Sequence, residues 1–221
     1  QQGEKERRLY AVMDAFAQNN GQIGISDARY VNAVKLIVQT ISPMKYTLHR
    51  AFAHAARNLP GDALRIATQL QGAEELRHAQ LELHAASIYN KYFNGLHETP
   101  RWYEQAWYLA PFKSFAEDAA AAGPFELLVA ISFGFDSLLS DALFVPYMSS
   151  AAHNGDLSLV PASFSAHADT ARHKALGISA VKFLLQHGAD VNDAVPATGR
   201  DGKPTAAINI AAINADFDLM S

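Results

Sequence analysis

Glu75 and His78 are the first pair of residues in this sequence whose types and spacing could do chemistry. They lie three residues apart in the segment EELRHAQ, within a stretch that we expect to be helical. Side chains three apart on a helix share one face, so this carboxylate and this imidazole point the same way. In a helical bundle, such a Glu-x-x-His pair is one of the two that a carboxylate-bridged di-iron site requires. The sequence therefore has to be searched for the second pair and for the carboxylates of the other two helices.

A second histidine, in the segment SAHADTARHKALG, has similar neighbours. Both histidines follow an acidic residue by four positions and an arginine by one position. The first set is Glu74, Arg77 and His78, and the second set is Asp169, Arg172 and His173. Thr170, however, stands three residues before His173, where a second Glu-x-x-His pair would have glutamate. A hydroxyl is a poor substitute for a bridging carboxylate.

The two outer helices of such a site should each add one carboxylate. Asp136 lies 34 residues before Thr170 and is the candidate on one outer helix. A similar distance before Glu75, shortened to about 30 for a tighter hairpin, leads to Lys45. No acidic residue lies between Asp27 and Asp62. The helix that carries Lys45 therefore offers no carboxylate to a metal.

Apolar spacing and helix-breaking residues predict the elements that position these side chains. We expect helices over residues 4–18, 27–58, 60–93, 124–152 and 157–187, with Ser26 or Asp27 as a cap and Pro60 in a first turn. Pro43 should kink or interrupt its helix near residues 40–42. The aromatic-rich connection 94–121 should hold one or two short helices.

These elements predict an all-α protein. Two helix hairpins joined by a long crossover are what a ferritin-like four-helix bundle requires, here with additional short helices. A different helical bundle or a helical repeat array are the alternatives, but no strong repeat is present. We expect residues 1–187 to form the bundle and residues 188–221 an irregular C-terminal tail, and we interpret the sequence as a fragment or excised core.

Composition excludes several classes of function. The chain has no cysteine, so disulfides, thiolate zinc sites and cysteine nucleophiles are excluded. The net charge of −4, without long runs of like charge, gives no sign of a nucleic-acid or lipid surface. No apolar run reaches the length of a membrane span and no signal peptide is evident, so we expect a cytoplasmic location. Phosphate-binding loops and a nucleophile elbow are absent from the sequence.

Several segments of the sequence resemble one family over roughly residues 3–187. The segments that carry the resemblance include EKERRLYAVMDAFAQNNGQ, EELRHAQ, YNKYFNGLH, WYLAPFKSF, AGPFELLVAISF and FSAHADTARHKALG. They are similar to the α subunit of bacterial multicomponent monooxygenases, specifically the phenol hydroxylase branch, with toluene monooxygenases next. The resemblance implies a ferritin-like bundle with a di-iron centre that activates O₂ and hydroxylates a small aromatic ring.

The resemblance also places the family's ligand positions on this sequence. Two glutamates of the family fall on Lys45 and Thr170, and a third falls on Asp136, which is one methylene shorter. The remaining metal positions, Glu75, His78 and His173, are intact. A helix threonine near the family's oxygen site falls on Ser140, which makes that hydroxyl a catalytic candidate. The resemblance gives an outer-shell position to Glu74, Arg77, Asp169 and Arg172.

Two classes of function follow. The first is an oxygenase chain that works with β and γ subunits, a regulatory protein and a reductase on O₂ and a small aromatic substrate, as the resemblance implies. The second is an inactive paralogue that acts as a structural or assembly subunit. An altered version of a working enzyme is a third possibility. The site could hold two irons, one metal ion or no metal, and the sequence leaves all three open.

By resemblance we assign the first class, but the charges of the residues argue against its activity. Two ferrous ions bring four positive charges, and Lys45 would add a buried ammonium beside only two carboxylates. We therefore hypothesise that Lys45 replaces the metal charge and pairs with Glu75 and Asp136 in the bundle centre.

Overall fold

The structure is a computed structural model, and it describes residues 2–95 and 99–187. Within these ranges it consists of helices and turns, without a strand. The helices in chain order are α1 (Gln2–Gln18), η1 (Gly21–Gly24), α2 (Ala28–Asn58), α3 (Asp62–Tyr89), α4 (Thr99–Gln105), α5 (Ala110–Ala121), α6 (Pro124–Leu127), η2 (Leu128–Phe135), α7 (Asp136–Leu139), η3 (Ser140–Phe144), α8 (Val145–His153) and α9 (Leu159–Gln186). The expected tail at 188–221 lies outside the described residues.

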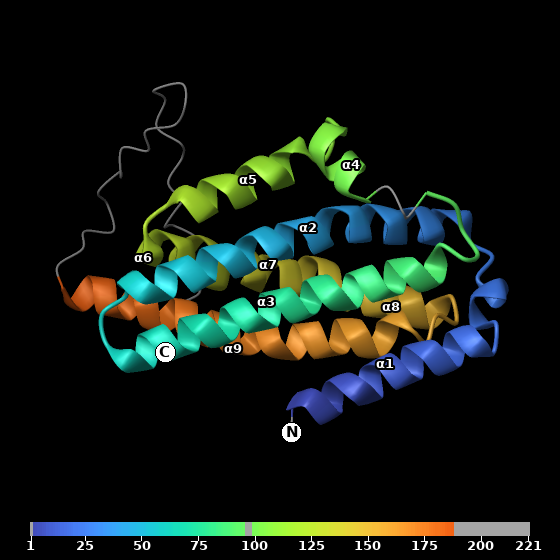
Figure 1. The fold of residues 1–221 in the computed structure, drawn as a ribbon, viewed down its shortest axis with the longest axis horizontal. Helices are drawn as coiled ribbons and strands as arrows, with labels where there is room; N and C mark the ends of the chain where they lie inside the picture. The colour runs from blue at the N-terminus through green and yellow to red at the C-terminus, as the bar shows by residue number, and fades with distance from the viewer. Residues whose placement is uncertain (1, 96–98, 188–221) are drawn as a thin grey trace.

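Four long helical stretches form the bundle. Helices α2 and α3 are one antiparallel hairpin, and the stretch from α6 to α8 forms the second hairpin with α9 (Figure 1). The crossover between the hairpins contains α4 and α5, which lie along the outside of α2. Helix α1 packs across α3 and α9 on the opposite side. The ferritin-like arrangement and the short crossover helices expected from the sequence are confirmed.

Helix α2 begins where the sequence predicts. The Asp27 carboxylate accepts a hydrogen bond from the Arg29 backbone N–H at 2.8 Å, which caps the helix. Of the two outcomes expected at Pro43, the interruption is wrong, because α2 runs unbroken from Ala28 to Asn58, and the kink stays a prediction. Buried side chains on both sides of the proline, Ile41 and Met44, hold the helix in the core at a free-energy gain that outweighs one lost backbone hydrogen bond. Pro60 lies in the connection before α3 and not in its first turn.

The stretch 124–152 was expected as one helix and differs from that expectation. It contains two π-helical segments, η2 and η3, which flank the short α7. A π segment shifts the angular position of every later side chain, and apolar spacing alone does not reveal it. Asp136 begins α7, directly after η2, and its side chain is fully buried. The π segment therefore contributes to aiming this carboxylate inward.

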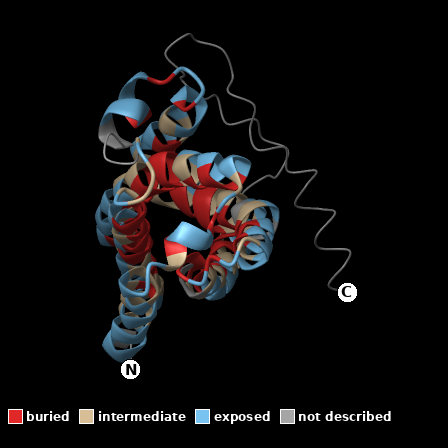
Figure 2. Cartoon of the chain, turned by 90° about the vertical axis from the view of Figure 1, so that its right-hand side faces the viewer, coloured by how far each residue is buried: buried red, intermediate tan, exposed pale blue. Residues whose placement is uncertain are grey.

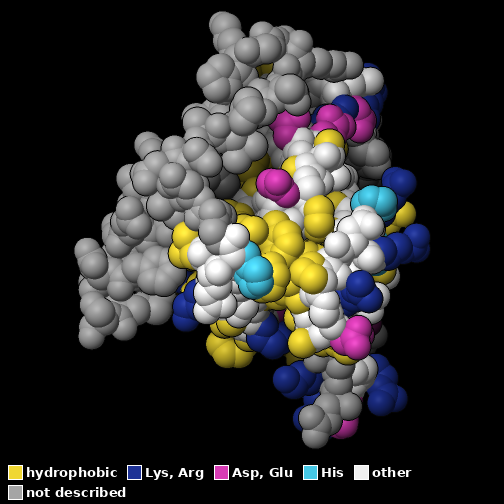
Figure 3. Space-filling view, turned by 90° about the vertical axis from the view of Figure 1, so that its left-hand side faces the viewer, with side chains coloured by type: hydrophobic (Ala, Val, Ile, Leu, Met, Phe, Trp, Pro, Cys, Tyr) yellow, Lys and Arg dark blue, Asp and Glu magenta, His cyan; other side chains and the backbone are white. Residues whose placement is uncertain are grey.

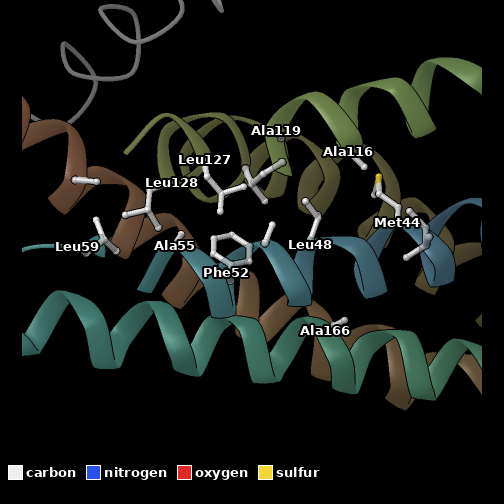
Figure 4. Close-up of a cluster of buried hydrophobic side chains, with 14 of the residues drawn as sticks. Met44, Leu48, Phe52, Ala55, Leu59, Ala116, Ala119, Leu127, Leu128 and Ala166 are labelled. Carbon is white, nitrogen blue, oxygen red and sulfur yellow. The ribbon is translucent and has the colours of Figure 1, made fainter. Parts of the chain in front are cut away.

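Two hydrophobic clusters make up the core, and Figure 2 shows the buried residues concentrated between the helices. One cluster surrounds Phe52 and Leu48 of α2, which meet Leu127 and Leu128 across the bundle (Figure 4). The other cluster lies toward the opposite end of α2 and includes Val34, Val38, Leu81 and Tyr89. Lys45 lies between Met44 and Leu48 along α2, within the range of the first cluster. The core thus leaves a polar layer within an apolar bundle.

By length and composition, one described stretch, Pro124–His153, is apolar enough to cross a membrane, although no membrane span was expected. Here the stretch packs against α9 and carries the buried, ion-paired Asp136, as a core helix does. At the end of the bundle where α2 leads into α3, hydrophobic side chains gather on the surface (Figure 3). Phe125 and Phe183 stack nearby, with ring centroids 5.3 Å apart.

Candidate functional site: a buried lysine among the expected metal positions

Lys45 lies at the centre of the bundle between two carboxylates. Its Nζ is 2.7 Å from Glu75 Oε2 and 3.0 Å from Asp136 Oδ1. All three side chains are completely buried. They come from α2, α3 and α7, so this contact joins both hairpins of the bundle. The contacts match the pairing that the charge argument gave from the sequence.

His173 of α9 completes the cluster. Its Nδ1 is 2.8 Å from Asp136 Oδ2 and 3.6 Å from Glu75 Oε1. Its Nε2 is 2.9 Å from Glu74 Oε2, so both ring nitrogens face carboxylates. An imidazole placed between carboxylates favours its charged form. The centre therefore combines two basic groups, Lys45 and His173, with the carboxylates of Glu75 and Asp136.

His78 lies next to this cluster but has different partners. Its ring centroid is 6.1 Å from that of His173, and its Nε2 is 3.0 Å from Asp169 Oδ2. Its Nδ1 is buried and has no hydrogen-bond partner. Each histidine is thus supported by the acidic residue from the other helix, Asp169 for His78 and Glu74 for His173. The sequence placed each acid beside the histidine of its own helix and could not show this exchange.

The electrostatics of Lys45 and Asp136 follow from their contact. Burial lowers the pKa of Lys45, but the carboxylates of Asp136 and Glu75 outweigh it, and the pKa is raised overall. Burial raises the pKa of Asp136, but Lys45 and His173 outweigh it and bring the pKa to about 2. Both side chains are therefore charged at neutral pH. For Glu75, burial raises the pKa and the adjacent Lys45 opposes that effect without cancelling it, so the pKa is raised overall.

The two histidines have opposite pKa shifts. Burial lowers the pKa of His173, but its contacts with Asp136 and Glu74 outweigh burial and raise the pKa to about 9. Burial, together with the nearby cations Lys45 and His173, lowers the pKa of His78 well below its usual value. His173 is thus an imidazolium and His78 a neutral imidazole at pH 7. Two groups that sequence treats as equivalent ligands have become different chemical species.

The donor set does not fit a two-iron centre. Glu75, Asp136 and His173 each offer a ligand atom, and these atoms lie within 4.8 Å of one another. However, the Lys45 ammonium contacts both carboxylates, and His173 adds a second positive charge. Two ferrous ions would place four more positive charges among two carboxylates, at a large electrostatic cost. His78 Nδ1 is buried and has no hydrogen-bond partner, so it could bind a ligand without breaking a contact.

The structure describes the side chain of Thr170 but not that of Ser140. The Thr170 side chain is buried, and its hydroxyl donates a 2.7 Å hydrogen bond to the His167 carbonyl of its own helix. Ser140 begins the π segment η3, and its side chain lies outside the described part of the chain. The catalytic role suggested for Ser140 therefore stays a prediction.

Two site residues were missed at the sequence level, Gln71 and Ser132. Gln71 Nε2 donates to Asp136 Oδ2 at 3.1 Å, and Ser132 Oγ donates to Gln71 Oε1 at 2.7 Å. Gln71 stands four residues before Glu75, and Ser132 stands four before Asp136. The same-face rule that linked Glu75 to His78 could have found both. They hold Asp136 in position from two helices.

The four outer residues form a chain of ion pairs between α3 and α9. Arg77 contacts Asp169, and Arg172 contacts both Asp169 and Glu74. Arg77 also donates to Ser165 Oγ at 2.8 Å. The chain of ion pairs connects the buried histidines to the surface, where Arg172 is more than half exposed. It fixes the orientation of both imidazoles.

Comparison with known proteins identifies a family that this chain matches. A family model described as methane, phenol and alkene hydroxylase matches residues 1–188. The chain is 50% identical over 189 residues to the oxygenase component DmpN of phenol 2-monooxygenase from Pseudomonas sp. strain CF600, covering 86% of this chain and 37% of that relative. It is 25% identical over 190 residues to the hydroxylase component large subunit of propane 2-monooxygenase from Gordonia sp. strain TY-5, covering 82% and 34%.

Solved structures agree with these matches. The crystal structure of xenon-pressurized phenol hydroxylase from Pseudomonas sp. OX1 is similar with a TM-score of 0.79 and 52% identity, covering 84% of this chain and 38% of that one. Toluene 4-monooxygenase shares the fold, with a TM-score of 0.70 at 18% identity, covering 84% and 62%. The chain spans little more than a third of the length of the curated relatives that it matches.

Proposed function

The chain belongs to the methane, phenol and alkene hydroxylase family, in the phenol hydroxylase branch, and from this premise we propose its role. It is an α-like chain of the oxygenase component of a phenol- or toluene-type multicomponent monooxygenase. It acts there as a structural or assembly subunit, because its bundle centre is held by ion pairs in place of two irons. The relatives' description as oxygenase and hydroxylase components supports a role within an assembly.

One observation carries this proposal: the positive charge of Lys45 stands between Glu75 and Asp136. Together with the imidazolium of His173, it balances both carboxylates inside the cluster. A buried cluster whose charges cancel needs no metal to neutralise it, whereas removing one member leaves an uncompensated charge. The bundle therefore keeps its fold and its outer surface without the family's metal chemistry.

The partners follow from the same premise. By resemblance, we propose that the chain docks with β and γ subunits and shares its assembly with a regulatory protein and a reductase, in the cytoplasm. A chain without oxygen chemistry would still contribute surface to such an assembly. Small aromatic substrates and O₂ would then be handled by another chain.

A second candidate function is O₂-dependent hydroxylation of a small aromatic ring by this chain itself, with one iron. The close ligand atoms of Glu75, Asp136 and His173 and the free His78 Nδ1 favour it. It requires Lys45 to leave the two carboxylates or to lose its proton. The raised pKa of Lys45 opposes proton loss, which is why this candidate ranks second.

Metal content separates the two candidates. The unmodified chain is expressed with added Fe(II), and total metal per chain is measured by elemental analysis. The Lys45→Glu/Thr170→Glu double variant restores the two missing carboxylates and is measured beside it. The matched control, Lys182→Glu/Ser179→Glu, makes a similar change of charge at exposed positions of α9. Far-UV circular dichroism checks that every variant keeps its helices.

The proposal expects no bound iron in the unmodified chain and in the control, and gain of iron in the double variant. About one iron per unmodified chain would favour the second candidate. About two would overturn the charge argument and make the chain a hydroxylase with unusual ligands.

A further inference from the structure

A groove lies between α1 and α9, beside the ion pairs of Arg77, Asp169 and Arg172 that support the two histidines. Its volume is about 330 Å³, and its walls come from α1, the Arg77 side chain of α3 and the first half of α9. Nothing in the function proposed above uses it. Its lining combines an apolar side with a group of cations, which is the composition of a site for an organic anion.

The Arg77 guanidinium is the buried polar group of this groove. Only 6% of its side chain is exposed. Its Nη1 donates to Ser165 Oγ and its Nη2 contacts Asp169, but its Nε is buried and has no hydrogen-bond acceptor. The nearest carboxylate oxygen on that side, Glu6 Oε1, is 3.7 Å away, beyond hydrogen-bond length. A buried donor without an acceptor is costly, so a carboxylate that displaced Glu6 from this N–H would gain a hydrogen bond that Glu6 does not make.

Further cations stand around the same groove. Lys5 and Arg8 line it from α1, and Arg172 lines it from α9. Arg8 is paired with Glu4 on its exposed side, and Arg172 with Glu74. Asp169 is the one carboxylate among the lining residues, and it is already bound by two arginines. Among the described lining residues, Lys5 is therefore the cation that has no acidic partner and can attract a negative charge into the groove.

The other side of the groove is apolar and open to solvent. Phe164 is 63% exposed and Val12 is 46% exposed, although both are large hydrophobic residues. Leu9 and Ala168 lie beside them along the groove. Exposed hydrophobic side chains next to cations suit a ligand with an apolar body and one charged end.

We propose that this groove binds a small organic carboxylate, with its charged end at Arg77 Nε and Lys5 and its apolar body against Phe164 and Val12. The apolar wall argues against inorganic phosphate, and the net charge of −4 argues against nucleic acid. Glu6 is the internal competitor for Arg77 Nε. Removing its charge should therefore strengthen binding.

Benzoate is a suitable probe, and benzamide, which has the same shape without the charge, is the matched control ligand. Binding to the full chain is measured by two-dimensional NMR titration and by calorimetry, without metal. We expect saturable binding of benzoate, with shifts confined to residues of α1 and α9, and no saturation with benzamide.

Variants at exposed positions test the assignment without disturbing the core. Lys5→Gln and Arg8→Gln should each weaken benzoate binding by about two- to fivefold, and Phe164→Ala should weaken it further. Glu6→Gln should tighten it. Arg7→Gln, a neighbouring arginine of α1 that does not line the groove, should leave it unchanged.

The proposal is overturned by equal binding of benzoate and benzamide, by benzoate shifts spread over other surfaces, or by no saturation. It is also overturned if Arg7→Gln weakens binding as much as Lys5→Gln does, because the effect would then be general charge. The readout involves no iron, so a failure here leaves the bundle-centre proposal untouched.

Discussion

Lys45 Nζ lies 2.7 Å from Glu75 Oε2, and neither side chain has any exposed surface. A lysine in an apolar bundle would ordinarily be expelled or deprotonated, because burial of an unpaired ammonium costs many kilocalories per mole. Here the ammonium keeps its charge because two carboxylates from two different helices face it. The pair therefore ties α2 to α3 and, through Asp136, to the second hairpin.

Replacing Lys45 with methionine should strongly destabilise the fold. The variant keeps the length of the side chain but leaves Glu75 and Asp136 facing each other without their cation. Loss of one partner from a buried ion pair costs about 3–5 kcal/mol. Urea unfolding followed by circular dichroism measures the change. Lys182→Met on the exposed face of α9 is the control, and an equal small effect of both variants would contradict the role given to Lys45.

His173 should make stability fall as the pH rises above neutral. Its folded-state pKa of about 9 exceeds the unfolded value near 6.5, so its stabilising contribution is complete below pH 6.5. This contribution is lost as the pH rises from about 6.5 through 9, and integrates to at most about 3 kcal/mol. NMR of the imidazole nitrogens should show His173 still protonated at pH 8. In His173→Gln the decline should vanish, whereas His153→Gln at an exposed position should retain it.

The general architecture could be predicted from local sequence. Apolar spacing and the cap at Asp27 predicted the long helices to within a few residues. The π segments around Asp136 could not be found in this way, because apolar residues occupy nearly every position of 128–135 and show no period. The interruption expected at Pro43 was wrong for a related reason. The residues on both sides of the proline are buried, which local sequence does not show, and their burial keeps α2 intact.

The pairing at the centre of the site could be predicted from the sequence, because the residue types there conflict with a metal site. Lys45 and Thr170 stand where carboxylates would be needed, and charge alone then pairs Lys45 with the two acids that remain. The sequence could not show that Asp169 supports His78 and Glu74 supports His173, since these contacts depend on the sideways offset of α3 and α9. The same holds for the groove at Arg77, which exists only where α1 crosses the bundle.

The close approach of α9 to η2 should make Gly177 intolerant of a side chain. A Cβ at this position would lie 2.4 Å from the Phe133 backbone nitrogen and 2.7 Å from its Cα, so no side-chain rotation could relieve the clash. Gly177→Ala should destabilise by about 1–3 kcal/mol, although alanine is favoured in helices by up to about 1 kcal/mol. Gly24→Ala, where nothing lies within 4 Å, is the control. A stabilised Gly177→Ala would show that the helices are farther apart.

The negative charge of Glu82 should destabilise the fold, whereas the charges of the ion-paired carboxylates stabilise it. It is buried away from the central cluster, and burial raises its pKa to about 7. Its Oε2 has no hydrogen-bond partner, and neither has the buried hydroxyl of Tyr147, whose pKa burial and Glu82 raise. Because the folded state disfavours the carboxylate, stability is unaffected below the unfolded value near 4.5. It declines as the pH rises from there through 7.

Glu82→Gln keeps the shape of the side chain and removes this penalty. The variant should match the unmodified chain below pH 4.5 and exceed its stability above pH 7 by up to about 3 kcal/mol. Urea unfolding at a series of pH values measures the difference. Glu126→Gln, at an exposed position, should show no such rise. If Glu82→Gln is less stable than the unmodified chain at pH 8, the carboxylate has a partner in the folded protein that stabilises its charge.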